Sequence, residues 1–271
     1  MRRPTDADGT GLPPLPDGLP AAVSARPLQG GDIAQVWEVV LADDQRVVVK
    51  TAATDATLEA EGLEALRAAG APAPRVVAVD PRVLVIEHVT GPPDLHALGR
   101  ELATAHQTLG EAFGWTRDNV IGSLPQANPW TDDWPTFYAE QRLAPYLPDL
   151  PTEQAARLSD AIEGPLPDLL DHDVPASLVH GDLWGGNIVG GRWLIDPAVH
   201  HADREIDLAM LDLFGGVPRA LQTGYDEVWP CDDGWQRRRP ALQLYHLLVH
   251  VRLFGAGYLG AVSHRLDELG W

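Results

Sequence analysis

The sequence predicts an α+β protein of two lobes, a small β-rich lobe followed by a larger and mostly helical one. Residues 28–90 have the pattern strand, strand, helix, strand, strand, whereas the chain after Gly91 shows mainly helical periodicity. A length of 271 residues is sufficient for two lobes that share a cleft. We therefore divide the chain into residues 1–20, 21–90 and 91–271.

The composition is that of a globular protein and argues against several classes. The chain is 45% hydrophobic and 22% charged, and its formal charge is −19. A negative field of this size argues against nucleic-acid and anionic-membrane partners. The single cysteine, Cys231, excludes an intrachain disulfide. No apolar run reaches the roughly 18 residues of a membrane span, and we read no secretion signal. We expect a cytoplasmic protein.

The first 90 residues contain the predicted small lobe. Residues 1–20 are dense in Pro, Gly and Asp, which predicts a loose arm. The stretch "VWEVVLADDQRVVVK" indicates a hairpin that turns at Asp43-Asp44 and ends at Lys50. A helix follows in "ATLEAEGLEALRAAG", with Gly70 as its stop, and two more strands flank the turn at Asp80-Pro81.

The second lobe begins after a hinge expected near Thr90–Asp94. We predict helices over Leu95–Leu109, Trp134–Leu147, Glu153–Leu170, Glu205–Leu213 and Pro240–Leu253. Short strands are expected near Leu178–Val179, Ile188–Val189 and Trp193–Ile195.

A glycine-rich polar loop lies among these short strands, in "LVHGDLWGGNIVGGRWLIDPA". Asp182 and Asn187 are five residues apart within it, and Asp196 ends the next strand. Glycines let such a loop turn tightly and bring its polar side chains to one side. Phosphoryl transfer needs a carboxylate for the attacking hydroxyl, with an amide oxygen and a second carboxylate that hold Mg²⁺. The loop supplies all three groups.

The same chemistry needs a lysine on an early strand and an acid on the following helix. Lys50 ends the strand "RVVVK" and is the only lysine among the 20 Lys and Arg residues. Glu59 and Glu61 are the candidate acids. Glu59 lies four and seven residues before Leu63 and Leu66, on the side of the helix that packs against the sheet. Glu61 is about 200° away round the helix and is expected to face water. We therefore select Glu59.

The blocks "HGDLWGGN" and "IDPAVHHADREIDLAMLDLFGG" resemble the fructosamine kinase (ketosamine-3-kinase) family, a branch of the aminoglycoside-phosphotransferase-like kinases. The stretches "FGWTRDNVIGSLPQANPWTDDWPTFYAEQRLAPYL" and "GWQRRRPALQLYHLLVHVRLFGAGY" resemble it too, so the resemblance covers nearly everything from Leu28 onward. It implies a bilobal protein-kinase-like fold. It also implies transfer of the γ-phosphate of ATP, with Mg²⁺, to a sugar hydroxyl of free or protein-bound ketosamines such as fructosamine or ribulosamine, the 3-hydroxyl in this family. The phosphorylated product would release its amine, which is a deglycation repair activity.

The resemblance also implies roles for individual residues. Asp182 matches the catalytic base, Asn187 and Asp196 the magnesium ligands, Lys50 the phosphate-binding lysine and Glu59 its partner. The nucleotide-covering loop corresponds to "LQGGDIAQVW", with Gly30 and Gly31 at its turn, and backbone groups of Glu87 and Val89 match the adenine-binding hinge.

Three further residues are expected to contact the substrate. Trp184 follows the Asp182-Leu183 pair, and its indole is either a wall for the sugar or amine or a packed core residue. Asp203 is expected to attract the secondary ammonium of a ketosamine. Arg204 is expected to pair with a loop carboxylate or a substrate acid.

Other interpretations remain open at this level. One alternative is a kinase of the same branch that phosphorylates another hydroxyl acceptor, such as an aminoglycoside or a choline-like alcohol. A non-catalytic nucleotide-binding protein is disfavoured because Lys50, Asp182, Asn187 and Asp196 are all present. A glycoside hydrolase with paired carboxylates would leave the strand lysine and the asparagine unexplained.

Overall fold

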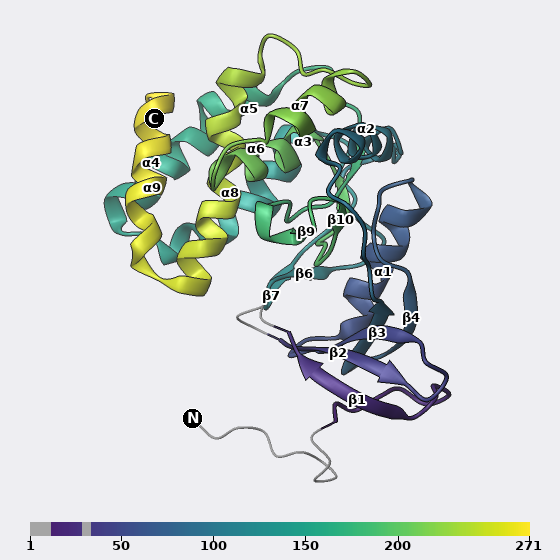
Figure 1. The fold of residues 1–271 in the computed structure, drawn as a ribbon. Helices are drawn as coiled ribbons and strands as arrows, with labels where there is room; N and C mark the ends of the chain where they lie inside the picture. Colours follow the sequence, from purple (N-terminus) through teal and green to yellow (C-terminus); the bar gives the residue numbers. More distant parts are fainter. Residues whose placement is uncertain (1–11, 29–33) are drawn as a thin grey trace.

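An antiparallel sheet of five strands forms the small lobe, and one helix packs against it (Figure 1). The structure is a computed structural model that describes residues 12–28 and 34–271. The strand order is β1-β2-β3-β5-β4, so β3 is the central strand. The elements of this lobe are β1 (Ala22–Pro27), β2 (Gln35–Leu41), β3 (Arg46–Thr51), α1 (Ala56–Ala68), β4 (Val76–Asp80) and β5 (Val83–Glu87).

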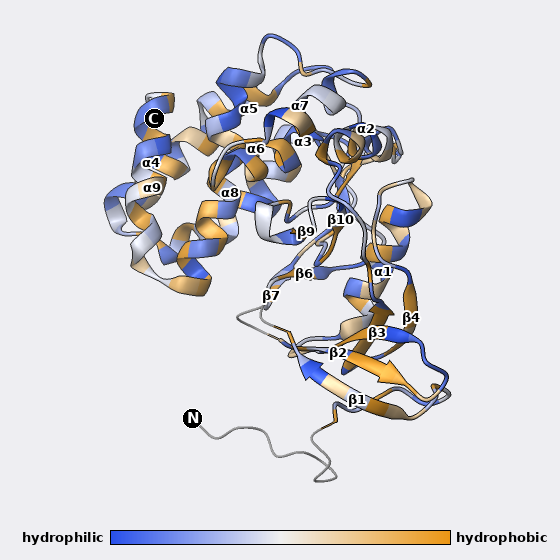
Figure 2. Ribbon diagram, in the orientation of Figure 1, coloured by the Kyte–Doolittle hydropathy of each residue, from blue (hydrophilic) through white to orange (hydrophobic). Residues whose placement is uncertain are grey.

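Alternating side chains explain how this sheet positions the lysine. Val47 and Val49 of β3 are buried on one face, where they pack in a cluster with Val39 of β2. Val48 and Lys50 therefore point to the opposite face, which carries α1, and Val48 packs in the cluster that contains that helix. Figure 2 shows the predominantly hydrophobic character of β2.

The segment before the sheet corrects the expectation of a loose arm over residues 1–20. Within the described part of that segment, Pro13 and Pro16 are buried, and Leu15 and Leu19 pack against the outer face of the sheet. These apolar side chains cover a face that would otherwise expose valines. Residues 1–11 lie outside the described part of the chain. Strand β1, which the sequence analysis did not predict, pairs with β2 at the sheet edge.

Helix α1 has clear local signals at both ends. Asp55 accepts a hydrogen bond from the Thr57 amide at 3.0 Å and caps the first turn. The chain turns away at Gly70, whose φ of +90° suits glycine. In its middle, Gly62 faces Pro197, and a β-carbon at Gly62 would lie 2.9 Å from the proline ring. The absent side chain thus lets α1 approach the second lobe closely.

The second lobe is mostly helical and contains short two-stranded sheets (Figure 1). Its helices are α2 (Leu95–His106), α3 (Trp134–Phe137), η1 (Tyr138–Leu143), η2 (Ala144–Asp149), α4 (Thr152–Glu163), α5 (Pro165–Leu170), η3 (Gly185–Asn187), α6 (Glu205–Leu213), α7 (Arg219–Asp226), α8 (Trp235–Phe254), η4 (Ala256–Tyr258) and α9 (Leu259–Leu269). Its strands are β6 (Asn119–Ile121), β7 (Leu124–Gln126), β8 (Ser177–Val179), β9 (Ile188–Val189), β10 (Trp193–Leu194) and β11 (His200–Ala202). The predicted two-lobed α+β fold is confirmed.

Two of the predicted helices are wrong as single elements. The stretch Trp134–Leu147 divides into the α-helix α3, the π-helix η1 and the 3-10 helix η2, in which Pro148 lies inside the helix. The stretch Glu153–Leu170 breaks at Gly164, because the following Pro165 has no amide hydrogen to continue the ladder and restricts the residue before it.

Two other boundaries differ from prediction. Helix α2 ends at His106, before the predicted Leu109. Helix α8 begins at Trp235, so Pro240 lies inside it and does not start it. Its first turns are held by Arg238, which forms ion pairs with Glu205 and with the preceding loop.

The apolar core continues from one lobe into the other. One cluster joins Leu63 and Leu66 of α1 and Ile86 of β5 to residues of the second lobe such as Leu183 and Leu194. A backbone hydrogen bond of 2.9 Å from the Leu194 amide to the Pro72 carbonyl lies at the same junction. Apolar packing and this hydrogen bond therefore join the two sides of the candidate site. None of the helices in the described residues has the length and apolar character needed to cross a membrane.

Candidate active site

Lys50 lies between two carboxylates that come from different parts of the chain. Its ammonium is 2.7 Å from Glu59 Oε2 on α1 and 2.8 Å from Asp196 Oδ1, which is 146 residues away in sequence. Burial alone would lower the pKa of Lys50, but the charges of Glu59 and Asp196 raise it above its ordinary value. The side chain is therefore a fixed cation at the lobe junction.

The neighbouring acid on α1 has a different environment. Glu61 accepts hydrogen bonds from the Trp115 indole at 2.7 Å and the Arg117 guanidinium at 2.7 Å. It does not contact Lys50. Glu59 and Glu61 therefore point in different directions from α1, as the helical spacing predicted. Glu61 was expected to face water, but it contacts a neighbouring loop.

The glycine-rich loop holds Asp182 and Asn187 together. The Asn187 amide nitrogen donates to the Asp182 backbone carbonyl at 2.8 Å and to its carboxylate at 3.3 Å. That use of the nitrogen leaves the Asn187 amide oxygen as the atom able to meet a cation. His180 accepts a hydrogen bond from the Asp182 amide and lies 3.0 Å from the Ile195 carbonyl, so it joins the loop to the strand that follows.

Asp207, on α6, anchors this loop through hydrogen bonds to its backbone. Its two carboxylate oxygens accept the backbone amides of His180 at 2.7 Å and Gly181 at 2.9 Å. Burial opposes its charge, but the hydrogen bond from His106 and the loop amides keep the pKa of Asp207 below its ordinary value. The sequence analysis did not single out Asp207. Its place in the block "DREIDLAM" was the available signal.

The acids of the site are in unequal electrostatic environments. Burial, followed by the negative charge of Asp196, raises the pKa of Asp182 to about 7. Burial raises the pKa of Glu59 against the attraction of Lys50. Burial also opposes the charge of Asp196, yet the Lys50 charge and hydrogen bond lower its pKa. Glu59 and Asp196 share the Lys50 ammonium, and Asp182 has no ion pair of its own among the described residues, so with all three carboxylates ionised the site has two uncompensated negative charges.

Asp196 has a strained backbone. Its φ is +57°, and among the described residues only Asp44, in a hairpin turn, is another non-glycine with positive φ. Such conformations persist where the surroundings enforce them, and they are frequent at functional sites. Pro197, packed against Gly62 of α1, is part of these surroundings.

Lys50, Glu59, Asp182, Asn187 and Asp196 line one cavity of about 680 Å³, a volume typical of ligand sites. Its walls also include two predicted hinge residues, Glu87 and Val89. Trp184 lines the cavity and is 43% exposed, so it is not a packed core residue. Its ring lies over Gly186, where a β-carbon would be 2.2 Å from the indole. The predicted Gly30 and Gly31 fall outside the described residues.

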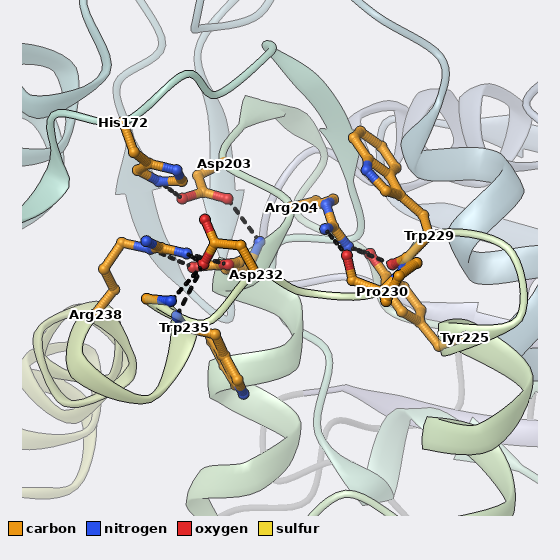
Figure 3. Close-up of polar contacts among 11 residues, drawn as sticks. His172, Asp203, Arg204, Tyr225, Trp229, Pro230, Asp232, Trp235 and Arg238 are labelled. Atoms are coloured by element: carbon orange, nitrogen blue, oxygen red, sulfur yellow. Dashed lines mark hydrogen bonds and ion pairs between the residues drawn. The ribbon is translucent and has the colours of Figure 1, made fainter.

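Asp203 and Arg204 do not line the cavity, which corrects the expectation of substrate contacts there (Figure 3). Asp203 is 1% exposed, accepts the Glu205 amide at 2.9 Å and lies 3.0 Å from His172 Nε2. Arg204 donates to the Tyr225 hydroxyl and to two backbone carbonyls beyond α7. Residues that begin a buried helix satisfy its first turn and tie down a loop, and these two are used in that way.

The sequence analysis missed part of the cavity wall. Residues 119–122 of the β6–β7 hairpin line it, as do His250 and Phe254 near the end of α8. Helix α8 was predicted, but periodicity alone did not indicate which of its residues face a cavity. The signal for these residues was their position inside blocks that resemble the kinase family.

The fold and the site together define a class, the protein-kinase-like phosphotransferases. The chain matches the family model described as fructosamine kinase over residues 19–270. It belongs to the fructosamine kinase family.

Individual relatives agree with this assignment. A Thermus thermophilus protein named "Probable ketoamine kinase" is 37% identical over 90% of this chain and 94% of its own. A Synechocystis protein with the same description is 43% identical over 64% of this chain and 61% of its own. A solved structure of a candidate fructosamine-3-kinase from Thermobifida fusca has a TM-score of 0.83 and 35% identity, and covers 92% of this chain and 93% of that one. Kinases of this family use ATP and a divalent metal ion on a small-molecule substrate.

Proposed function

We propose that this protein transfers the γ-phosphoryl group of ATP to a sugar hydroxyl of a ketosamine, the 3-hydroxyl by analogy with its family. The observation that carries the proposal is the convergence of Lys50, Glu59, Asp182, Asn187 and Asp196 on one cavity in a chain of the fructosamine kinase family. Release of the amine from the phosphorylated product would make the activity a deglycating one, on free or protein-bound ketosamines.

The donor set of the site fits a magnesium ion. Asn187 and Asp196 supply the oxygen ligands that Mg²⁺ prefers, and the surplus of carboxylates over ammonium groups favours a divalent cation. When bound, Mg²⁺ would neutralise charge on the phosphates. Asn187 and Asp196 would hold it, Lys50 would contact the phosphates, and Glu59 would keep Lys50 in place.

Asp182 has the features of the base. Its carboxylate lines the cavity, and a pKa of about 7 suits a group that accepts a proton near neutral pH. In the reaction, the hydroxyl oxygen bonds to the γ-phosphorus while the bond from that phosphorus to the bridging oxygen breaks. The hydroxyl proton passes to Asp182, and ADP leaves. Asn187 donates a hydrogen bond to the Asp182 carboxylate, and Asp207 accepts one from the Gly181 amide, so both residues help to hold Asp182 in place.

The test is a panel of phosphate acceptors assayed with ATP and Mg²⁺: fructosyl-, ribulosyl- and erythrulosyl-lysine against an aminoglycoside. We expect phosphorylation of at least one ketosamine and none of the aminoglycoside. Asp182→Asn should lower kcat by about 10²-fold or more and still bind ATP. Turnover of the aminoglycoside alone, or full activity in Asp182→Asn, would overturn the proposal.

A further inference from the structure

Four aromatic rings gather where α6 and α8 end beside the cavity. His250 of α8 has its ring centroid 4.8 Å from Phe214, 5.4 Å from Phe254 and 4.9 Å from Tyr258. His250 and Phe254 line the cavity, and Phe214 follows directly on the last residue of α6. Helices α6 and α8 pack side by side, so the C-terminal ends of both helices reach the same rim of the cavity (Figure 1).

Two of these rings, Phe214 and Phe254, are unusually exposed to solvent for apolar side chains. Phe214 is 42% exposed and Phe254 is 49% exposed, although apolar side chains of this size are usually buried. A cluster of exposed aromatic rings at the wall of a cavity is typical of a ligand-binding surface. The small-lobe side of the cavity, with Lys50 and the hinge, is the side expected to hold the nucleotide. The wall on α8 is thus available to the acceptor.

His250 adds a polar atom to this apolar wall. Its Nδ1 lies 2.7 Å from the His246 carbonyl, which only accepts, so the Nδ1 hydrogen is used there. Burial lowers the pKa of His250 below its ordinary value, which favours the neutral ring. In that tautomer Nε2 carries a lone pair and acts as a hydrogen-bond acceptor.

A ketosamine has two parts with different chemistry. The sugar part is polar, whereas the amine nitrogen is a secondary ammonium that carries a substituent, such as the alkyl chain of lysine. Aromatic faces attract both alkyl carbons and cations, and a neutral imidazole nitrogen accepts a hydrogen bond from an ammonium.

We propose that His250 and Phe254, backed by Phe214, form the subsite for the amine side of the ketosamine. The rings contact the substituent on the amine, and Nε2 of His250 accepts a hydrogen bond from the secondary ammonium. This inference rests on the proposed function and deepens it, because it makes the amine substituent a determinant of specificity. The preferred substrates are ketosamines of amines with an apolar chain or ring.

The experiment compares two acceptors with the same sugar, the ribulosamines of benzylamine and of methylamine. Wild-type protein should have a lower KM for the benzyl compound. Phe254→Ala should raise the KM for the benzyl compound by about tenfold, and Phe214→Ala, which removes only the ring behind His250, should raise it by less. Both variants should leave the KM for the methyl compound and for ATP within about twofold. Trp130→Ala is the matched control, because Trp130 is 52% exposed and does not line this cavity. It should change none of these constants.

The hydrogen-bonding role of His250 is tested separately. His250→Phe keeps a ring but removes the acceptor atom, so the KM for both ribulosamines should rise by about tenfold while kcat and the KM for ATP stay within about threefold. His250→Gln places an amide oxygen near the same position and should restore most of the affinity.

The outcomes separate the subsite from the proposed function. If wild-type protein turns over ketosamines but the phenylalanine variants affect both acceptors equally or neither, the subsite is wrong and the function stands. Unchanged acceptor KM in His250→Phe also rules out the hydrogen bond. If wild-type protein phosphorylates no ketosamine, the proposed function fails and the subsite fails with it.

Discussion

At the scale of single residues, Lys50, Glu59 and Asp196 form one group of charges that depend on one another. The ammonium contacts Glu59 and Asp196 at 2.7 and 2.8 Å, and its side chain is only 16% exposed. The ammonium of lysine is a compact point charge, whereas the guanidinium of arginine is a planar fork with fixed donor directions. Removal of one partner from a buried ion pair leaves a charge without compensation, so each member of this set depends on the other two.

Glu59→Gln should lower kcat/KM for ATP by about ten- to hundredfold, because Lys50 would then be held by Asp196 alone and would shift from its proposed phosphate-binding position. Glu61→Gln is the control. It lies two residues away on the same helix but contacts Trp115 and Arg117, so kcat/KM should stay within about twofold. Steady-state kinetics with varied ATP measures both. Equal losses in the two variants would contradict the assigned partner.

The choice of Glu59 over Glu61 shows what sequence can resolve at this scale. Helical spacing alone indicated that Glu59 faces the sheet, and the structure places it on Lys50. The same spacing could not indicate the partners of Asp203 and Arg204. Their contacts, to His172 and to the loop after α7, depend on segments far away in the chain.

At the scale of secondary-structure elements, helix α1 connects the two lobes. It packs against β4 and β5 on one side, and Gly62 lies against Pro197 on the other. Asp196, next to that proline, has φ of +57°. The close approach of α1 therefore helps to hold the acid that Lys50 contacts. A glycine in a helix interior lowers helix stability by about 1 kcal/mol relative to alanine. The close contact with Pro197 accounts for a glycine at position 62.

Gly62→Ala tests this role of the helix. A β-carbon would lie 2.9 Å from Pro197 Cγ, so we expect a loss of about 1–2 kcal/mol in the free energy of unfolding, despite the better helix propensity of alanine. Activity should fall too. Gly260→Ala in α9 is the control, since a β-carbon there meets no atom within 4 Å, and it should stabilise by up to about 1 kcal/mol. Urea unfolding measures both. A Gly62→Ala variant as stable as wild type would refute the packing argument.

At the scale of the whole molecule, the second lobe buries several neutral histidines behind the glycine-rich loop. Burial lowers the pKa of His180 and of His200, and it lowers the pKa of His246 to about 4. His246 lies 3.0 Å from the Gly181 carbonyl, directly before Asp182. A core that needs uncharged histidines connects the stability of the lobe to pH.

The sign follows from proton binding. Between pH 6.5 and pH 4 the unfolded chain binds a proton at His246 and the folded chain does not, so this histidine lowers stability as pH falls through that range. Its contribution should change by about 2 kcal/mol between pH 7 and pH 5. His246→Gln removes this proton binding, so its free energy of unfolding should fall less than that of wild type over the same range.

Urea unfolding of His246→Gln and wild type at pH 7 and pH 5 measures the difference. His264→Gln is the control, because His264 lies exposed on α9 and its replacement should leave the pH dependence unchanged. Identical pH slopes in wild type and His246→Gln would show that His246 can be protonated in the folded protein.

The sequence by itself determined the features that depend on local pattern. Alternation in "RVVVK" placed Lys50 on a strand, helical spacing selected Glu59, and the glycine-rich loop brought Asp182 and Asn187 together. Neighbouring residues set these features, so period and spacing carry the information.

The tertiary structure alone decided how distant segments meet. It placed Asp196 on Lys50 across 146 residues, tied Gly181 to Asp207, and brought the ends of α6 and α8 to one cavity rim. It also buried Asp203 and Arg204 away from that cavity. Each of these contacts depends on how lobes and helices pack, and packing is set by the shape of the whole core, which no local spacing records.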